Sequence, residues 1–432
     1  MSQEPLYVPP PPAERRIWLR RILHLRRHMS WDQTFTALKY RNYRLWFWSQ
    51  IISLFGTWME STALGFLIFQ LTKSPAYLGL VGFAAGVPTW LFMLYAGVIA
   101  DRVPRRNLLV ATQTAMMLLA FLTAALTFLH WIQPWHILVM AFLFGVANSF
   151  DAPARQSFVL EMVSFEDMTN AIALNSAMFN TAMALGPAVG GLLYGYLGPG
   201  WCFTINGASF LAVIAALQRM KLKAFVPRQE RFSAAAELKE GLKYVVRHPL
   251  IRTIIGLVGA VSLFGISFVT LFPAWAVDIL HGDAKTNGFL QSARGLGALV
   301  AALLIASLGR FGFRGKLLTF GTFALPVTVA AFAFVRWTPL ALLIVFGSGL
   351  ANILVLNLAN ALVQTHAHDR LRGRIMSVYT LTFFGMMPVG ALAIGFAAEH
   401  WGQRAAVLIA AGAMLAAASL LTIAMPGLRH QA

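Results

Sequence analysis

The chain has 432 residues, of which 58% are hydrophobic and only 12% are charged, and its mean hydropathy is +0.67. Soluble proteins carry about a quarter of their residues as Asp, Glu, Lys and Arg, so this composition excludes an ordinary soluble domain and indicates a protein that crosses a membrane several times. The formal charge of +18 suits a membrane surface better than nucleic acid, because a nucleic-acid reader displays its basic residues on a soluble domain. We therefore expect no nucleic-acid partner.

The first 43 residues are predicted to form a basic cytoplasmic tail (1–43). They contain no apolar core of about 7 to 15 residues, so a cleaved signal peptide is not expected. Within the tail, the apolar residues Trp18, Ile22 and Leu25 recur at helical spacing, with pairs of arginines between them. Two interpretations stay open, a helix lying on anionic lipid headgroups or a disordered arginine-rich segment.

Twelve apolar segments follow the tail, and each is long enough for a membrane-spanning helix, which needs about 20 residues. Continuous apolar runs predict helices, because the strands of a membrane β-barrel alternate apolar and polar residues. The predicted spans are 45–71, 76–99, 106–129, 135–154, 170–196, 201–219, 251–275, 286–308, 316–335, 339–362, 375–398 and 404–425. The predicted fold class is an all-α membrane protein with twelve transmembrane helices.

The basic residues predict the orientation of these helices. If the N-terminus is cytoplasmic, 29 of the 34 Lys and Arg residues fall in the tail, the inner loops or the C-terminus. Such an excess of positive charge marks the cytoplasmic side of membrane proteins. We therefore expect a multi-pass protein of the cell inner membrane, with both termini cytoplasmic and with anionic lipid headgroups beside its inner loops.

One long interruption, from Arg219 to Leu250, divides the spans into six and six. Inside it, Leu238, Leu242 and Val245 share a helical face, which predicts an amphipathic surface helix at 233–247. The predicted divisions after the tail are a six-helix bundle at 44–220, a linker at 221–250 and a second six-helix bundle at 251–432.

Weak internal symmetry supports two related halves. Phe144-Gly145 in the fourth span corresponds to Phe346-Gly347 in the tenth. Pro187 in the fifth span corresponds to Pro388 in the eleventh, at nearly the same offset. Repeats of this kind are typical of transporters, in which two pseudo-symmetric bundles enclose a central site.

The stretch Gly97-Val98-Ile99-Ala100-Asp101-Arg102-Val103-Pro104-Arg105-Arg106 joins the second and third spans on the predicted inner side. It resembles the signature loop of the major facilitator superfamily, a glycine, an Asp-Arg pair and then two basic residues. The resemblance implies a conformational latch made of Gly97, Asp101, Arg102, Arg105 and Arg106. Pro104 stands where the family has a second glycine, which leaves the turn geometry open. The alternative is a basic loop that only orients the helices, a role that an acid would weaken.

The fifth span contains Gly186-Pro187-Ala188-Val189-Gly190-Gly191. Gly186 and Gly190 permit close approach of another helix, and Pro187 removes a backbone donor and bends the span. The stretch resembles a motif of the proton-coupled exporters of the superfamily, with Gly186, Pro187, Gly190 and Gly191 as its residues. Small Ala182 and Ala173 replace the family's earlier glycines. The resemblance favours export.

Two further stretches narrow the resemblance to one branch of the superfamily. One runs from Asp151 to Gln156 and continues through Asn170 to Asn175, and the other runs from Asp369 to Ser377. Both are similar to the branch of enterobactin-exporter-like and drug-efflux secretion proteins. The similarity extends from about residue 40 nearly to the end of the chain.

The one acid well inside a predicted span is Glu60. Gln50, Ser53 and Thr57 precede it at spacings that place all four on one face of the first helix. An ionised carboxylate is costly in a membrane, so it tends to face a cavity. We expect Glu60 to carry the coupling proton or to recognise a cation on the wall of a central cavity. The alternative is a structural Glu60 that is hydrogen-bonded to an asparagine.

Other polar residues inside the predicted spans are candidates for substrate contact. Arg294 would bind an anionic substrate or pair with Glu60 if it faced inward, or would extend to the outer headgroups if it did not. Asn180 and Asn357 are equally consistent with substrate contacts and with hydrogen bonds between helices.

The sequence lacks the motifs of an ATP-driven pump and of a metal-dependent enzyme. Gly312-Phe313-Arg314-Gly315-Lys316 has neither the spacing nor the Ser or Thr of a nucleotide-binding loop, and no His-Glu-x-x-His pattern occurs. The single cysteine, Cys202, excludes a cysteine-rich metal site, so we expect no enzyme, no cofactor and no metal. The predicted function is proton-coupled antiport of small amphipathic molecules by a monomeric secondary exporter. The alternatives are a dedicated siderophore exporter and, more remotely, a non-transporting scaffold.

Overall fold

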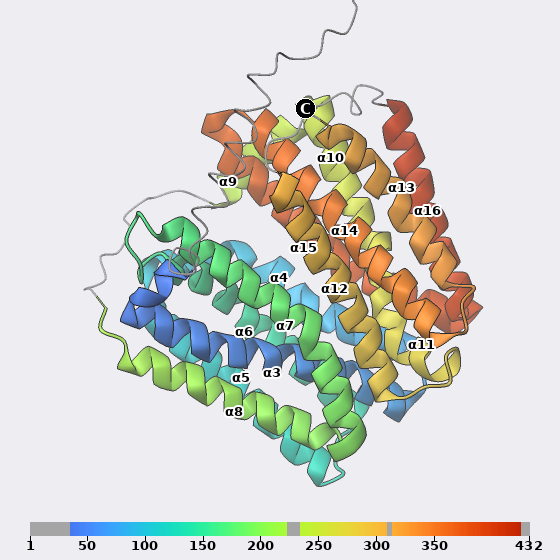
Figure 1. The fold of residues 1–432 in the computed structure, drawn as a ribbon, viewed down its shortest axis with the longest axis horizontal. Coiled ribbons are helices and arrows are strands. Elements are labelled where there is room, and N and C mark those ends of the chain that lie inside the picture. Colours follow the sequence, from blue (N-terminus) through green and yellow to red (C-terminus); the bar gives the residue numbers. More distant parts are fainter. Residues whose placement is uncertain (1–34, 223–233, 309–312, 425–432) are drawn as a thin grey trace, which may run out of the picture.

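The computed structural model describes residues 35–222, 234–308 and 313–424, which form helices joined by short loops (Figure 1). Most of the predicted tail, including its apolar pattern, lies outside the described residues. Within the described part, twelve helical segments are long and apolar enough to cross a membrane. The predicted fold class, twelve transmembrane helices in two six-helix bundles, is confirmed.

Six long helices make up the first half, which Figure 1 shows in blue to green. A short 3-10 turn precedes them. The bounds are η1 Thr36–Lys39, α3 Arg41–Thr72, α4 Pro75–Arg102, α5 Arg105–Phe128, α6 Pro134–Val159, α7 Met168–Leu197 and α8 Pro199–Arg219.

The second half, which is largely orange to red in Figure 1, begins after a shorter helix, α9. Its first span consists of four short pieces. The bounds are α9 Ala234–Arg247, α10 Pro249–Ala260, η2 Val261–Gly265, η3 Ser267–Leu271, α11 Phe272–Asp278, α12 Ala284–Leu308, α13 Arg314–Phe332, α14 Thr338–His366, η4 Asp369–Leu371, α15 Arg372–Trp401 and α16 Gln403–Ala424.

Equivalent turns in the two halves use glycine. Gly198 joins α7 to α8 at φ +86°, and Gly402 joins α15 to α16 at φ +82°. A positive φ is strained for residues with a side chain, so glycine is favoured where a helix ends and the chain reverses. Proline then opens α8 at Pro199, where the missing N–H has no helical partner to lose.

Several helices run beyond their predicted ends. The fourth span was predicted to stop at residue 154, but α6 continues through Pro153 to Val159. The apolar window measures only the part of a helix that lies in hydrocarbon, whereas backbone hydrogen bonding continues through the polar residues that follow. This extra turn carries Arg155 and Gln156.

The seventh span is not the single helix that was predicted at 251–275. After α10 the chain forms a π-helical turn, η2, and a 3-10 turn, η3, before α11. Pro273 in the first turn of α11 has no N–H to donate to the preceding carbonyls, which accounts for part of the break. Stacking of Trp275 on Phe332, with a centroid distance of 4.5 Å, packs the short α11 against α13.

The amphipathic helix α9 packs across the start of α15. A Cβ atom on Gly241 would lie 2.5 Å from the backbone oxygen of Arg374, so the two helices touch at this glycine. Glu240, the residue before it, forms an ion pair with Arg374. These contacts pack the helix of the linker against the second half.

The two halves meet at two crossings that are related by the internal symmetry. In the α4–α15 crossing, a Cβ atom on Gly79 would lie 2.7 Å from the backbone oxygen of Ala391. In the α7–α12 crossing, a Cβ atom on Gly191 would lie 3.0 Å from Cα of Gly288. Backbones this close require glycine, as is common where membrane helices pack tightly.

Candidate transport cavity

A cavity of about 1160 Å³ lies between the two halves. Four helices of the first half (α3, α4, α6 and α7) and two of the second (α14 and α15) contribute to its wall. It reaches from the middle of the molecule, at Thr89 and Phe384, to the ends of α4 and α15 at Asp101 and Gly373. We call this the motif end, and we call the end that carries Ser74 the opposite end.

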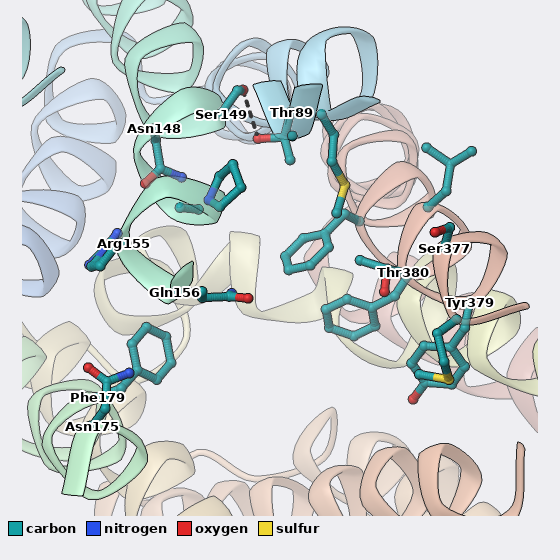
Figure 2. A pocket seen from close by; sticks show the side chains of 18 of the residues that line it. Thr89, Asn148, Ser149, Arg155, Gln156, Asn175, Phe179, Ser377, Tyr379 and Thr380 are labelled. Carbon is teal, nitrogen blue, oxygen red and sulfur yellow. Dashed lines mark hydrogen bonds between the residues drawn. The ribbon is translucent and has the colours of Figure 1, made fainter. Parts of the chain in front are cut away.

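The first-half wall is rich in side-chain amides. Figure 2 shows Asn148 and Gln156 on α6 and Asn175 on α7 around one side of the cavity, with Arg155 between them. Asn180 on α7 also lines it. Amides both donate and accept hydrogen bonds, so this wall can bind polar groups of either kind.

The second-half wall is more apolar and lies across the cavity on α15. Ser377, Tyr379 and Thr380 appear together on this side of Figure 2. Phe383 and Phe384 follow them on the same helix and also line the cavity. The two walls therefore differ in proportion. Amides are concentrated on α6 and α7, where Phe179 also lies, and rings and hydroxyls are concentrated on α15.

An ion pair supports the amide wall. Asp151 is fully buried, and its Oδ2 lies 2.9 Å from Nη2 of Arg155 one helical turn later. Thr112 Oγ1 and Gln113 Nε2 on α5 each donate a 2.9 Å hydrogen bond to Asp151 Oδ1. Asp151 thus holds the arginine at the cavity wall, where the side chain of Arg155 keeps 21% of its exposure.

Sequence reasoning treated Asp151 and Arg155 as marks of a branch and missed their place at the cavity. The signal was present in the spacing, because Asn148, Ala152 and Arg155 recur at intervals of four and three residues along one helical face. All three line the cavity. A span that ends at residue 154 leaves Arg155 outside the helix, so the pattern is not apparent from hydropathy alone.

Glu60 was expected on the wall of the central cavity, but it lies between α3 and α8. Asn206 on α8 donates a hydrogen bond from Nδ2 to Glu60 Oε2, and Glu60 is only 8% exposed. Gly56, one turn earlier, packs directly against Asn206. Glu60 is not among the residues that line the cavity, so its side chain belongs to the α3–α8 contact, as the structural alternative proposed.

The other residues on that face share its position. Gln50 and Ser53 are buried, and Thr57 donates a hydrogen bond to the backbone oxygen of Ser53. None of the three lines the cavity. The face was identified correctly as polar, but α3 turns it toward the interior of its own half, because α3 packs against α7 and α8.

Two of the three remaining predicted cavity residues also lie away from the cavity wall. Arg294 is on α12, and no hydrogen bond or ion pair joins its side chain to Glu60 or to any other described residue. Asn357 on α14 is exposed, whereas Asn360 on the next turn lines the cavity. Asn180, as noted above, does line it.

Arg294 does not face the lipid either. The exposed apolar residues of α12 include Phe289, Leu296 and Val300, which form one stripe. At about 100° per residue, Arg294 lies about 160° from Leu296 around the helix. Arg294 therefore lies on the face of α12 opposite its exposed apolar stripe. This position disfavours the second alternative, in which the side chain extends to the outer headgroups.

The signature loop lies at the mouth of the cavity. Asp101 Oδ1 is 3.2 Å from Nη2 of Arg105, which also pairs with Glu161 at the end of α6. Arg106 donates a 3.1 Å hydrogen bond to the backbone oxygen of Gln218 on α8. Gly97, Asp101 and Arg102 line the cavity. These contacts all stay within the first half.

Pro104, the departure from the family pattern, fits the turn. It occupies the N-cap position of α5, with φ −56° and ψ 116°, and Arg105 is the first helical residue. Proline fixes φ near this value, and a residue at the N-cap needs no N–H for a helical hydrogen bond. The loop therefore keeps its two basic residues at the start of α5.

The glycine-proline motif of α7 builds contacts to both halves. Gly186 and Gly190 pack against Trp58 and Met59 of α3, and Gly191 packs against Gly288 of α12. The backbone N–H of Ala188, just after the proline, donates a 2.8 Å hydrogen bond to Ser292 Oγ on α12. This N–H follows Pro187 in α7, and its hydrogen bond joins the first half to the second.

Polar contacts join the halves at the opposite end. Glu399 on α15 accepts a 2.7 Å hydrogen bond from Ser74 Oγ and a 3.3 Å hydrogen bond from the backbone N–H of Ala76 at the start of α4. Lys285 Nζ on α12 lies 3.9 Å from the centre of the Tyr196 ring on α7. Together with the glycine crossings, these contacts close the opposite end.

The chain matches the family described as "Transmembrane secretion effector" over residues 32–430. It belongs to the major facilitator superfamily. The superfamily consists of membrane transporters of small molecules, so this protein is a transporter and not an enzyme. Among the described residues, no group of three or more His, Cys, Asp and Glu side chains is placed to hold a metal ion.

Relatives of this transporter include proteins that act on different molecules. It is 22% identical to the staphyloferrin A transporter of Staphylococcus aureus over 83% of the chain and 90% of the relative. It is 26% identical to the multidrug efflux pump Tap of Mycolicibacterium fortuitum over 87% of the chain and 93% of the relative. It is 24% identical to the enterobactin exporter EntS of Escherichia coli over 93% and 96% respectively.

Solved structures show the same fold. The nucleoside transporter NupG superimposes with a TM-score of 0.69 at 16% identity, covering 90% of this transporter and 99% of NupG. A bacterial homolog of the lysosomal transporter Spinster superimposes with a TM-score of 0.65 at 15% identity, covering 90% and 96%. At these identities the likeness concerns the fold alone.

Proposed function

We propose that this transporter is a secondary exporter that works by alternating access. The observation that carries the proposal is the cavity between the halves, which reaches the motif end while glycine crossings and polar contacts close the opposite end. A protein whose cavity opens at one end only is in one of the two conformational states that alternating access requires. In the other state, the same wall would face the opposite end.

The charge distribution supports a cytoplasmic motif end. The basic residues Arg102, Arg105 and Arg106 lie there, and 29 of the 34 basic residues fall on the predicted inner side. With this orientation both termini are cytoplasmic, the protein lies in the cell inner membrane, and the cavity collects substrate from the cytoplasm. The inner basic residues then lie beside anionic lipid headgroups.

The substrate is a small amphipathic molecule in this proposal. Pockets for small ligands are about 300 to 1000 Å³ in volume, so a cavity of about 1160 Å³ is large enough for one such molecule. Its amide wall suits polar groups, and its ring-bearing wall suits apolar ones. A dedicated siderophore exporter is the second candidate, because two of the relatives are a staphyloferrin A transporter and an enterobactin exporter.

A proton gradient is the proposed driving force. Two acids are buried within membrane-spanning helices of the described chain, Glu60 and Asp151. A proton can shift the balance between the two states only if the acid binds it with different affinity in each. Glu60 lies in a contact within the first half, and Asp151 lies behind the cavity wall, so each is a candidate for this role.

Closure of the motif end is proposed to use the signature loop. Asp101, Arg102, Arg105 and Arg106 occupy the cavity mouth or the adjacent turn, and Asp369, Arg372 and Arg374 lie at the corresponding end of the second half. When the halves rock together, charges of opposite sign on the two sides would be brought within reach of each other. Such pairs would stabilise the state in which the cavity faces outward.

Reconstitution of the full chain tests the proposal. In vesicles with an acidic lumen, transporter molecules whose motif end faces the external solution should carry substrate into the lumen in exchange for protons. Dissipating the pH gradient should abolish this accumulation. A panel of tetracycline, ethidium, a catecholate siderophore and a citrate-based siderophore separates broad export from siderophore export. A non-transporting scaffold would move none of these compounds. Native mass spectrometry tests the proposed monomer.

A further inference from the structure

We infer that Arg155 binds an anionic oxygen group of the exported molecule, a carboxylate or an ionised phenol, while an aromatic part of the same molecule packs on α15. The inference rests on the proposed function, because it assigns the substrate class of the same cavity. It follows from the geometry of one ion pair and from the distribution of charge around the cavity.

The guanidinium of Arg155 is held in place by a buried partner. Asp151 has no exposed surface. Its Oδ2 forms an ion pair with Nη2 of Arg155 at 2.9 Å, and its Oδ1 accepts hydrogen bonds from Thr112 and Gln113. An arginine anchored in this way loses little conformational freedom when a ligand binds, which strengthens recognition. Asp151 is therefore a positioning residue.

Most of the donors of Arg155 are left for a ligand. A guanidinium carries five N–H donors in a planar fork. The contact with Asp151 uses Nη2, and no other described residue bonds to Arg155. Because the side chain also lines the cavity, the remaining N–H groups can form the paired hydrogen bonds with which arginine recognises carboxylates.

The surroundings of Arg155 suit an oxygen-rich molecule with a ring. Asn148, Gln156 and Asn175 lie around the arginine on the same side of the cavity (Figure 2). Their amide N–H groups can donate to further oxygens of the ligand. Phe383 and Phe384 on α15 offer ring surfaces across the cavity.

Charge disfavours the opposite class of ligand. Asp101 at the mouth is the one acid among the described residues that line the cavity, and it is paired with Arg105. Asp151 has no surface open to a ligand. A cation entering the cavity therefore meets Arg102 and Arg155 without a free carboxylate to balance it, whereas an anion meets a prearranged guanidinium.

Two dyes with the same ring system and opposite charge provide the test. Fluorescein is an anion with a carboxylate and an ionised phenol near neutral pH, and rhodamine 123 is a cation built on the same xanthene ring. Binding to the purified full chain can be measured by fluorescence anisotropy in phosphatidylcholine nanodiscs, which contain no net anionic lipid to compete for Arg155. Fluorescein should bind at least about tenfold more tightly than rhodamine 123.

Variants of the ion pair separate recognition from folding. A hydrogen bond to a charged group contributes about 1.5 to 3 kcal/mol, so Arg155→Gln should weaken fluorescein binding by at least about tenfold. Arg155→Lys, which keeps the charge without the planar fork, should weaken it less. Asp151→Asn loosens the anchor of the guanidinium without removing the guanidinium itself, so it should weaken fluorescein binding, but by less than Arg155→Gln does.

Two further variants serve as controls. The double variant Asp151→Asn/Arg155→Gln leaves no buried charge, so it should stay folded and still bind fluorescein weakly. Phe384→Ala removes a ring from the opposite wall and should weaken both dyes alike. Equal binding of the two dyes, or fluorescein binding that is unchanged in folded Arg155→Gln, would overturn the assignment.

Failure of this inference is distinguishable from failure of the proposed function. If the vesicles show flux driven by a pH gradient but Arg155→Gln binds fluorescein normally, the assignment of Arg155 is wrong and export stands. If fluorescein binding depends on Arg155 but no compound moves under any gradient, the site stands and the exporter proposal is wrong.

Discussion

Ser74 and Glu399 are more than 300 positions apart in the chain, yet Ser74 Oγ donates a 2.7 Å hydrogen bond to the Glu399 carboxylate and ties α4 to α15. The backbone N–H of Ala76 adds a second, longer bond to the same oxygen. Glu399 thus binds the N-terminal end of a helix of the other half, where the helix dipole favours a negative charge. This contact is one of those that close the opposite end.

Replacing Glu399 by Gln should weaken that closure. A partly exposed, charge-assisted contact of this kind contributes about 1 kcal/mol, so the ratio of open to closed molecules should rise roughly fivefold. Spin labels at Trp131 and Trp337, which are exposed in the loops of the opposite end, would report a larger population of long distances. Glu166→Gln, an exposed acid near the motif end, is the matched control and should leave that distribution unchanged.

Substituting Gly191 by Ala should hinder closure of the opposite end by a steric mechanism. Its Cβ atom would lie 2.5 Å from the backbone oxygen of Ala284 and 3.0 Å from Cα of Gly288. Overpacking of this kind costs about 1 to 3 kcal/mol, and here the cost falls on the state in which α7 and α12 touch. The same spin-label distances should lengthen and transport should fall roughly tenfold. Gly412→Ala, where a Cβ atom meets nothing within 4 Å, should have no effect.

The two buried acids can be compared directly as proton carriers. Glu60→Gln keeps a side-chain oxygen that can accept from Asn206 but cannot take up a proton, and Asp151→Asn does the same beside Arg155. The variant that removes the coupling acid should lose the dependence of flux on the pH gradient and keep substrate exchange at equal pH. Gradient-driven flux that persists in both variants would show that neither acid is required.

Asp101→Asn should slow turnover more than it weakens binding. Asp101 pairs with Arg105 at the mouth of the cavity. If the loop stabilises the closed motif end, loss of the charge should lower the maximal transport rate about tenfold, a barrier change of about 1.4 kcal/mol, with KM within about twofold. A rise in KM at an unchanged maximal rate would instead assign Asp101 to substrate binding.

A cluster outside the membrane predicts a dependence of stability on pH. Hydrogen bonds from Lys39 and then Tyr40 lower the pKa of Asp167 below its ordinary value, and the Lys39 contact is 2.6 Å. A lowered folded-state pKa stabilises the fold above the ordinary pKa of about 4, and this stabilisation is lost as the pH falls through the folded-state value. Asp167→Asn should therefore flatten the decline of the unfolding temperature on the acid side of pH 4. Glu166→Gln at the neighbouring position should retain the parent's decline.

Much of the fold could be predicted from the sequence because its signals are local. An apolar run of about 20 residues, a proline or glycine at a helix end and the side on which arginines accumulate are each determined by a short stretch of chain and by the membrane. Besides the helix ends, the exception in the fold is the seventh span. There the apolar run continues through a π-helical and a 3-10 turn, because hydropathy does not register how the backbone is hydrogen-bonded.

The site was harder to predict for a different reason. Gln50, Ser53, Thr57 and Glu60 were correctly placed on one face of α3, but a helical face alone does not say which neighbour it meets. The close approach of Gly56 to Asn206 turns that face toward α8. Conversely, Asn148 and Arg155 reach the cavity because α6 continues past Pro153.

The sequence by itself therefore determined that this chain has twelve segments able to cross a membrane and the superfamily to which it belongs. Only the tertiary structure decided that Arg155 faces the cavity and that Glu60 meets Asn206 instead. The rotation of each helix depends on contacts between residues far apart in the chain, such as Gly191 with Gly288, and no local stretch of sequence contains them. Most of the charge of +18 remains a predicted signal of orientation, and Arg155 is the basic residue for which the cavity suggests a role in recognition.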